Sequence, residues 1–190
     1  MISKITICNL ALAQLGQAPI SSLTQEDEKA RRLNLFYEPV RDEVLRSHNW
    51  GFATAEEPLA LVEKQENSFL YKYPQEALFI RRVYQEPYRH TPFRELFHPK
   101  YRIRVLESAC PQAWAEYTRR AEDENQFDSA FVKSFSLALA ADLAVSLTGD
   151  NALAAQILQK YTLSLDEARR SNMTENFAQT GQTDAFTEVR

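Results

Sequence analysis

The sequence predicts a mainly α fold of the α+β type: a helical bundle of about four long helices with a small antiparallel β insertion and an extended C-terminal arm. Apolar residues recur at helical spacing within residues 1–50 and 125–170, which form the predicted helical core. Aromatic and branched residues form short runs within the β-rich insertion, residues 51–124, and periodicity is lost over residues 171–190. We therefore expect a single domain over residues 1–170, followed by the arm.

The stretch FDSAFVKSFSLALAADLAVSLTGD, residues 127–150, is predicted to be the central helix of the core. Asp128 suits the N-cap, and Gly149 suits a left-handed C-cap. Large apolar residues recur between them at a spacing of four: Phe131, Phe135, Leu139, Leu143 and Leu147. The stretch is long enough to cross a bilayer, but Lys133 and Asp142 interrupt it, and buried charge is costly in lipid. We interpret it as the core helix of a soluble protein.

Two further helices are predicted, one at the start of the chain and one directly after the central helix. Ser3 suits an N-cap and Gly16 ends the first helix, whose apolar stripe is Ile5, Cys8, Leu12 and Leu15. Asn151 is the expected cap of the last helix, whose stripe is Leu153, Ile157, Tyr161, Leu165 and Ala168. The short turn at Gly149 predicts that the last helix packs antiparallel against the central one.

Thr24 and Asp27 are predicted to start a second helix. Its inner stripe is Ala30, Leu33, Tyr37, Val40 and Val44. Pro39 lies within this stripe, and proline removes a backbone donor and clashes with the preceding turn. We therefore expect a kink there, or two helices that meet at Glu38.

The β insertion is predicted from a change in residue type between the helical parts. The runs FLYKY, residues 69–73, and ALFIRRVY, residues 77–84, indicate two short strands. A third strand is expected at residues 101–106, with residues 114–117 as its antiparallel partner. Residues 86–100 contain three prolines and little periodicity, so they are expected to form a loop.

Composition limits the classes of function. The net charge of -4 and the pI of about 5.5 argue against a surface that binds nucleic acid over its whole extent, although local basic patches remain open. The N-terminus lacks the pattern of a signal peptide, so we expect synthesis and residence in the cytosol. Cys8 and Cys110 are expected to be free thiols rather than a disulfide.

Motifs for catalysis or cofactor binding are missing from the sequence. The four glycines are far apart, which excludes a glycine-rich phosphate loop, and the histidines lack metal-ligand spacing: His48, His90 and His98. Glu56 and Glu57 are interpreted as a solvated pair. Asp142 is expected to be a satisfied polar group in the core or to face another subunit. We therefore predict no catalytic residue, no cofactor and no metal.

Positive charge is concentrated in one part of the chain. Residues 72–104 contain eight basic and three acidic residues, a local charge of +5 that leaves -9 for the remainder. Four arginines from the predicted strands are candidates for an interface or for a DNA channel: Arg81, Arg82, Arg102 and Arg104. We expect them on one exposed β face that meets an acidic neighbour or DNA. A plainly solvated face is an equal alternative.

The arm contains few large apolar residues after Met173, namely Phe177, Phe186 and Val189. Ordering its backbone costs roughly 1 to 2 kcal/mol per residue, so we expect the arm to become ordered only on a partner surface. Phe177 and Phe186 are the candidate anchors.

Landmarks of one family occur in order along most of the chain. The opening landmarks are Cys8-Asn9, Ala11-Leu12, Leu15-Gly16, Ile20 and Ser22-Leu23. The later ones are Trp50, Phe52-Ala53, Tyr71, Tyr73-Pro74, Phe127-Asp128, Phe131, Leu139-Ala140 and Leu143-Ala144. Together they resemble the tail tubular protein A family, the head-to-tail adaptor of short-tailed bacteriophages. Residues 81–110 carry no landmark of that family.

The resemblance implies a structural virion protein at the head-tail junction, made in the host cytoplasm, and not an enzyme. Twelve copies would form a ring between the phage portal protein and the tail nozzle, a tail tubular protein B-like protein, with tail fibres as a further candidate partner. Viral DNA would pass through the central channel without sequence-specific binding, and no membrane or cofactor would be involved. The alternative is a DNA-binding regulatory protein, against which the acidic pI and the lack of a basic recognition helix weigh. A lytic enzyme is a third reading.

Overall fold

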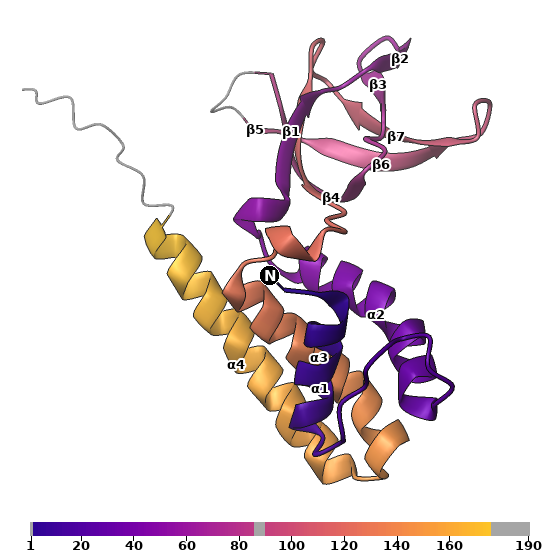
Figure 1. Cartoon of the computed structure of the whole chain (residues 1–190). Helices are drawn as coiled ribbons and strands as arrows, with labels where there is room; N and C mark the ends of the chain where they lie inside the picture. The colour runs from indigo at the N-terminus through magenta and orange to yellow at the C-terminus, as the bar shows by residue number, and fades with distance from the viewer. Residues whose placement is uncertain (1, 86–89, 176–190) are drawn as a thin grey trace, which may run out of the picture.

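The computed structural model describes residues 2–85 and 90–175, with side chains as far as residue 171. Within these residues, four α-helices form one half of an α+β fold, and two four-stranded antiparallel sheets form the other (Figure 1). Of the residues that the structure describes, strands make up 25% and helices 47%. The predicted helical bundle with a small β insertion is therefore wrong, because the β part is a second half with a hydrophobic core of its own.

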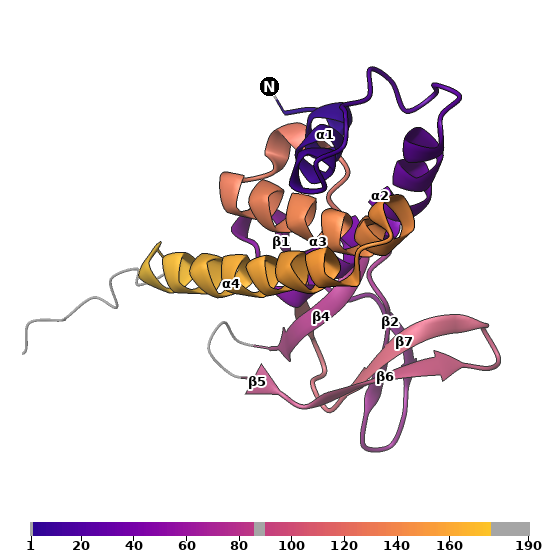
Figure 2. The same ribbon diagram turned by 90° about the horizontal axis from the view of Figure 1, so that it is seen from below.

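Helix α3 (Ser129–Thr148) is the centre of the helical half, as predicted. Three helices pack against it: α1 (Lys4–Gln14), α2 (Glu28–Ser47) and α4 (Asn151–Glu175) (Figures 1 and 2). The Asp128 carboxylate accepts a hydrogen bond from the backbone N–H of Phe131 at 2.6 Å, and Gly149 has a left-handed φ of 70°. Both predicted caps of α3 are confirmed. The helix is long and apolar enough to span a membrane, but 61% of its apolar window is buried inside the fold, as in a core helix.

The predicted starts of α1 and α2 are also confirmed, because Ser3 and Asp27 each accept hydrogen bonds from backbone N–H groups of the first turn. Helix α2 runs through Pro39 as one helix, so two helices meeting at Glu38 is wrong. Pro39 and Leu35 are both exposed. The carbonyl of Leu35, which loses its donor, can therefore be hydrated, and this makes the proline tolerable.

Helix α4 packs antiparallel against α3, as predicted (Figure 1). Its cap is Asp150 rather than Asn151: the Asp150 carboxylate accepts two backbone hydrogen bonds from the first turn at 2.8 and 3.0 Å. The helix continues to Glu175, so residues 171–175 are helical and do not belong to an extended arm. Residues 176–190 lie outside the described residues.

The two sheets have the strand orders β1-β8-β4-β5 and β2-β3-β7-β6. The first consists of β1 (Thr54–Pro58), β8 (Trp114–Arg119), β4 (Ala77–Tyr84) and β5 (His90–Thr91). The second consists of β2 (Leu61–Lys64), β3 (Phe69–Lys72), β7 (Ile103–Ser108) and β6 (Phe93–His98). Side chains from β3 and β7 meet those from β4 and β8 in the second hydrophobic core.

The predicted strands exist, but one predicted pairing does not. The runs at residues 69–73 and 77–84 are β3 and β4, and the third predicted strand is β7. Its expected pairing with residues 114–117 is wrong, because β7 pairs with β3 and β6 whereas β8 pairs with β1 and β4. The chain passes from one sheet to the other between β7 and β8. Residues 86–100, expected to be a loop, contain β5 and β6.

Two connections join the halves, and both run through one aromatic cluster. They contain the short 3-10 turns η1 (Gly51–Ala53) and η2 (Glu124–Gln126). The ring centroids of Phe52 and Phe127, one from each connection, are 5.6 Å apart. Trp50 and Phe127 each meet Phe131 of α3 edge to face, at 5.2 and 4.7 Å. Aromatic pairs at these separations add to the stabilisation from burial, so the cluster fixes one half on the other.

Candidate interaction surface

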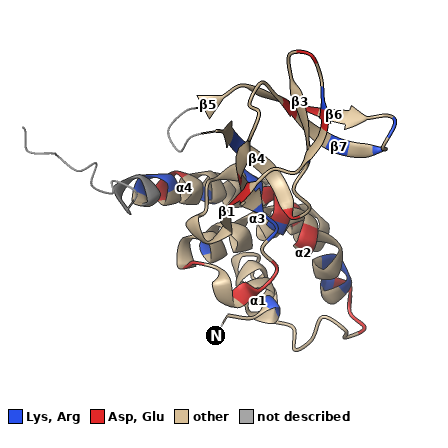
Figure 3. Cartoon of the chain, turned by 90° about the horizontal axis from the view of Figure 1, so that it is seen from above, with Lys and Arg blue, Asp and Glu red and all other residues tan. Residues whose placement is uncertain are grey.

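The structure separates the four arginines that the sequence placed on one exposed β face. Arg81 and Arg82 lie on β4 in the first sheet and Arg104 lies on β7 in the second. Arg102 lies in the turn of the β6–β7 hairpin, and the tip of this hairpin is basic (Figure 3). A single arginine face is therefore wrong. Contact of any one arginine with an acidic neighbour or with DNA stays a prediction.

Arg81 joins the β half to the end of α2. Its Nε donates a hydrogen bond to Thr118 Oγ1 at 2.8 Å. Its Nη2 donates to the backbone carbonyls of His48 at 2.8 Å and Arg46 at 3.2 Å. The guanidinium lies 4.8 Å from the centroid of the Phe79 ring. Burial lowers the pKa of Arg81, and the nearby charge of Glu116 opposes this shift. Its role is structural.

Arg82 follows an irregularity in β4, whose register against β8 shifts between Ile80 and Arg82. As a result, Arg81 and Arg82 line the same polar hollow although they are adjacent in a strand. Arg82 is paired with Glu116 at 2.5 Å and with Glu56 at 3.5 Å. Its charge is thus neutralised within the chain, which makes it a poor candidate for binding a phosphate.

The arginines of the second sheet are more exposed. Arg104 is paired with Glu95 at 2.7 Å and lies 3.8 Å from the centroid of the Tyr73 ring. Arg102 has a φ of 54° and takes part in no ion pair within the described residues. The hairpin also presents Phe97, whose side chain is 63% exposed. Of the four arginines, Arg102 is best placed to meet a partner.

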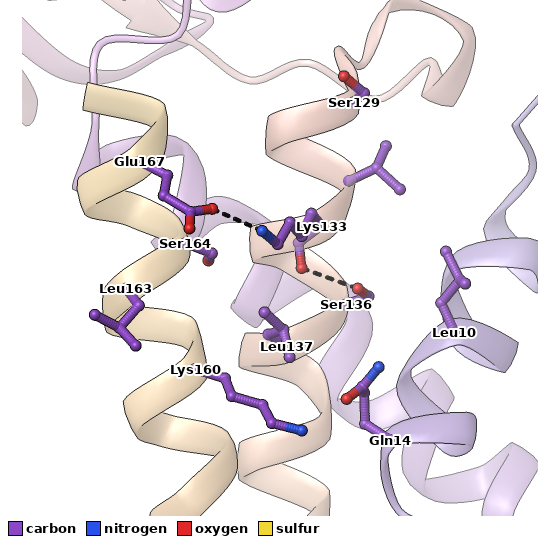
Figure 4. Close-up of a pocket in the computed structure, with 11 residues that line it drawn as sticks. Leu10, Gln14, Ser129, Lys133, Ser136, Leu137, Lys160, Leu163, Ser164 and Glu167 are labelled. Atoms are coloured by element: carbon purple, nitrogen blue, oxygen red, sulfur yellow. Dashed lines mark hydrogen bonds and ion pairs between the residues drawn. The ribbon is translucent and has the colours of Figure 1, made fainter. Parts of the chain in front are cut away.

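A groove of about 500 Å³ lies between α1, α3 and α4 (Figure 4). Its floor is apolar and comes from Val132 and Leu137 of α3, which are buried. Its walls carry Leu10 of α1 and Leu163 of α4, whose side chains are 43% and 56% exposed. The groove therefore offers apolar surface that this chain leaves uncovered in its described part.

Polar groups surround the groove. Lys133 Nζ donates a hydrogen bond to Glu167 across its mouth at 2.7 Å, and the hydrogen bond and charge of Lys133 lower the pKa of Glu167 (Figure 4). The hydroxyls of Ser134 and Ser164 lie 3.0 Å apart between α3 and α4, and both are buried. Lys160 lines the groove and takes part in no ion pair within residues 2–85 and 90–175. An apolar floor with a cationic rim suits an apolar segment that carries negative charge.

The groove continues toward the C-terminal end of α4. A second hollow of about 330 Å³ shares four of its lining residues: Ser129, Lys133, Ser164 and Glu167. It adds Ala130, Ala168 and Ser171. The apolar depression thus runs between α3 and α4 as far as Ser171, about one helical turn before the end of α4 at Glu175.

Three other residues singled out in the sequence do not line the groove: Asp142, Cys8 and Cys110. Asp142 is exposed on α3 rather than buried in the core, and desolvation, then the charge of Glu43, raises its pKa. Cys8 and Cys110 are free and buried, and burial raises the pKa of Cys8 to about 12, which makes its thiol unreactive. The described residues contain no group of three or more His, Cys, Asp and Glu side chains that could hold a metal ion.

Sequence reasoning missed the groove, and it placed the arm anchors Phe177 and Phe186 where the structure describes nothing. One signal for the groove was available. Leu10 and Leu163 fall outside the stripes that α1 and α4 bury, and large apolar residues away from a buried stripe indicate a second contact surface.

Comparison with known proteins adds no assignment. No protein-family model matches the chain, and no curated protein matches it.

Proposed function

We propose that this protein is a structural subunit of a phage head-to-tail adaptor, similar to the tail tubular protein A family. Copies of the chain form a ring in the virion between the portal protein and the tail nozzle. DNA passes through the central channel without sequence-specific binding, and the subunit catalyses no reaction. The ring is assembled from protein made in the host cytoplasm.

The observation that carries the proposal is the uncovered apolar surface of the helical half. Leu163 of α4 is 56% exposed, and Leu10 of α1, which is 43% exposed, stands across the groove from it. Isolated exposed leucines are ordinary, but apolar side chains gathered around a groove mark an interaction site. A subunit of a closed ring needs such a surface, because each copy presents one patch to the copy before it and another to the copy after it.

The residues that carry the resemblance also support the proposal, because they belong to the core of the fold. Trp50, Phe52, Phe127 and Phe131 form the aromatic cluster that joins the two halves. Leu139, Ala140, Leu143 and Ala144 are buried on α3. The landmarks are therefore residues on which this fold depends, as expected if they belong to a shared architecture.

Assembly is the property to measure. The purified chain is analysed by native mass spectrometry and by electron microscopy, alone and mixed with the portal protein of the same phage. We expect rings of the chain on portal rings. A chain that stays monomeric or dimeric with the portal present, and instead shifts duplex DNA in a gel at physiological salt, would refute the adaptor and support the DNA-binding regulator.

A further inference from the structure

We propose that the groove between α1, α3 and α4 binds residues 176–190 of a second copy of this chain. The inference rests on the proposed function and specifies one contact of the ring. Three observations support it: the apolar groove, the composition of the segment, and the place where α4 ends. They concern different parts of the molecule.

The groove has the size and lining of a site for one or two apolar side chains. Its volume of about 500 Å³ lies within the range of about 300 to 1,000 Å³ that is usual for binding pockets. Leu10 and Leu163 face each other across it above the floor formed by Leu137 (Figure 4). An aromatic ring placed between them would bury apolar surface on three sides.

Residues 176–190 match this lining. The segment NFAQTGQTDAFTEVR carries Phe177 and Phe186 as its two aromatic residues, and Asp184 and Glu188 exceed its single basic residue. Its net charge is thus negative, whereas the groove contributes two lysines and one glutamate. Phe186 lies between the two acidic residues, so an aromatic anchor in the groove brings carboxylates near Lys160, the lysine of the groove that is not paired with Glu167.

A different exposed segment fits less well. The β6–β7 hairpin also carries an exposed aromatic residue, Phe97, but Lys100 and Arg102 lie at its tip. Insertion of that tip would bring its cations toward the lysines of the groove, and like charges in contact oppose binding. Charge therefore selects residues 176–190 over the hairpin.

The end of α4 favours a neighbouring copy over the same copy. Helix α4 has 25 residues and α3 has 20, so α4 projects past the start of α3 by several ångströms (Figures 1 and 2). Fifteen extended residues reach roughly 50 Å, which is enough to cross to an adjacent subunit. A donor segment at one end and an acceptor groove elsewhere on the same chain give a head-to-tail contact that can close into a ring.

Peptide binding tests the groove. The receptor is the full chain with Phe177→Ala and Phe186→Ala, which removes competing anchors, and the probe is a fluorescein-labelled peptide of residues 176–190. We expect saturable binding by fluorescence anisotropy. Adding Leu163→Ser to the receptor weakens it about tenfold, because apolar contact with the anchor is lost. Leu158→Ser is the matched control, since Leu158 is equally exposed on α4 but does not line the groove. It changes the affinity less than twofold.

Photocrosslinking identifies the donor. Benzoylphenylalanine replaces Phe186 in one preparation, which is mixed with isotope-labelled unmodified chain under conditions of assembly. We expect cross-links from the probe to labelled peptides that contain Leu10 or Leu163. Cross-links confined to the probe's own copy, cross-links elsewhere on the fold, absence of saturable peptide binding, or equal effects of Leu158→Ser and Leu163→Ser would each overturn the inference. If rings still form on the portal in any of these cases, the adaptor function stands and only this contact is wrong.

Discussion

Replacing Arg81 by methionine should weaken the attachment of the β half to the helical half. Methionine keeps an unbranched apolar side chain that can still pack on Phe79, but it cannot donate hydrogen bonds. The variant leaves Thr118 Oγ1 and two carbonyls at the end of α2 without their donor. The change therefore isolates the polar role of the guanidinium from its packing.

The expected cost follows from the environment of each bond. The bonds to Thr118 and to the His48 carbonyl are both 2.8 Å long and partly buried, whereas the bond to the Arg46 carbonyl is 3.2 Å long and exposed. Hydrogen bonds to charged groups contribute about 1.5 to 3 kcal/mol each, and an exposed carbonyl recovers its bond from water. Allowing for partial access of water to the first two, we expect a loss of about 3 kcal/mol. For a protein of this size that corresponds to a decrease in Tm of roughly 6 to 12 °C.

Urea denaturation monitored by circular dichroism measures this difference, with Arg94→Met as the matched control. Arg94 is also a strand arginine paired with a carboxylate, Glu107, but its side chain is 73% exposed. Exposed ion pairs contribute at most about 1 kcal/mol, so the control should stay close to the wild type. If Arg81→Met and Arg94→Met lower the free energy of unfolding equally, the anchoring role of Arg81 is wrong.

Three further predictions concern charge, pH and a helix cap. Reversing Arg102 and Arg104 to Glu should weaken assembly most at low salt, where charges are least screened, and light scattering that is unchanged at every salt concentration would leave only a solvated surface. Burial, then two nearby arginine charges, lowers the pKa of His48 below its usual 6.5. The unfolded chain therefore takes up the proton first as pH falls, so the free energy of unfolding should decrease from about pH 7 to about pH 5 more in the wild type than in His48→Gln; equal pH slopes in urea denaturation would contradict this. Gly149→Ala should cost about 1 kcal/mol because φ is 70° there, whereas Gly51→Ala, with no positive φ and equally open space, should cost less; the two melting temperatures decide.

The strands that the sequence predicted and those it missed differ in their place in the sheets. The predicted strands became β3, β4, β7 and β8, which are all central, whereas the missed strands are β1, β2, β5 and β6, which are all edges. A central strand packs on neighbours on both sides, so it concentrates branched and aromatic residues. An edge strand such as β6, FRELFH, keeps four of its six residues exposed and shows no alternation. The missed half of the β structure is therefore the half with little hydrophobic signal.

The helices were predictable because their signals are local. Asp128, Gly149 and the spacing of four act within one or two turns, and each contributes in the structure as the sequence indicates. The partners of Arg81 and the lining of the groove depend instead on segments that are distant in sequence. Thr118 is 37 positions away from Arg81, and a bulge in β4 decides which way both arginines face. No local pattern encodes such contacts.

The aromatic cluster at the junction determines how the molecule would carry mechanical tension. The chain leaves the helical half at Trp50 and returns at Phe127. Phe52 and Phe127, one from each connection, contact each other, and both contact Phe131 of α3. A stretching force applied between residues 2 and 175 is transmitted through α3, because α1 and α4 both pack on it. The β half lies outside this path, so it bears no stretching force until the contacts of the aromatic cluster break. In a pulling experiment the helices should therefore yield first, and the two sheets should extend as a separate, later event.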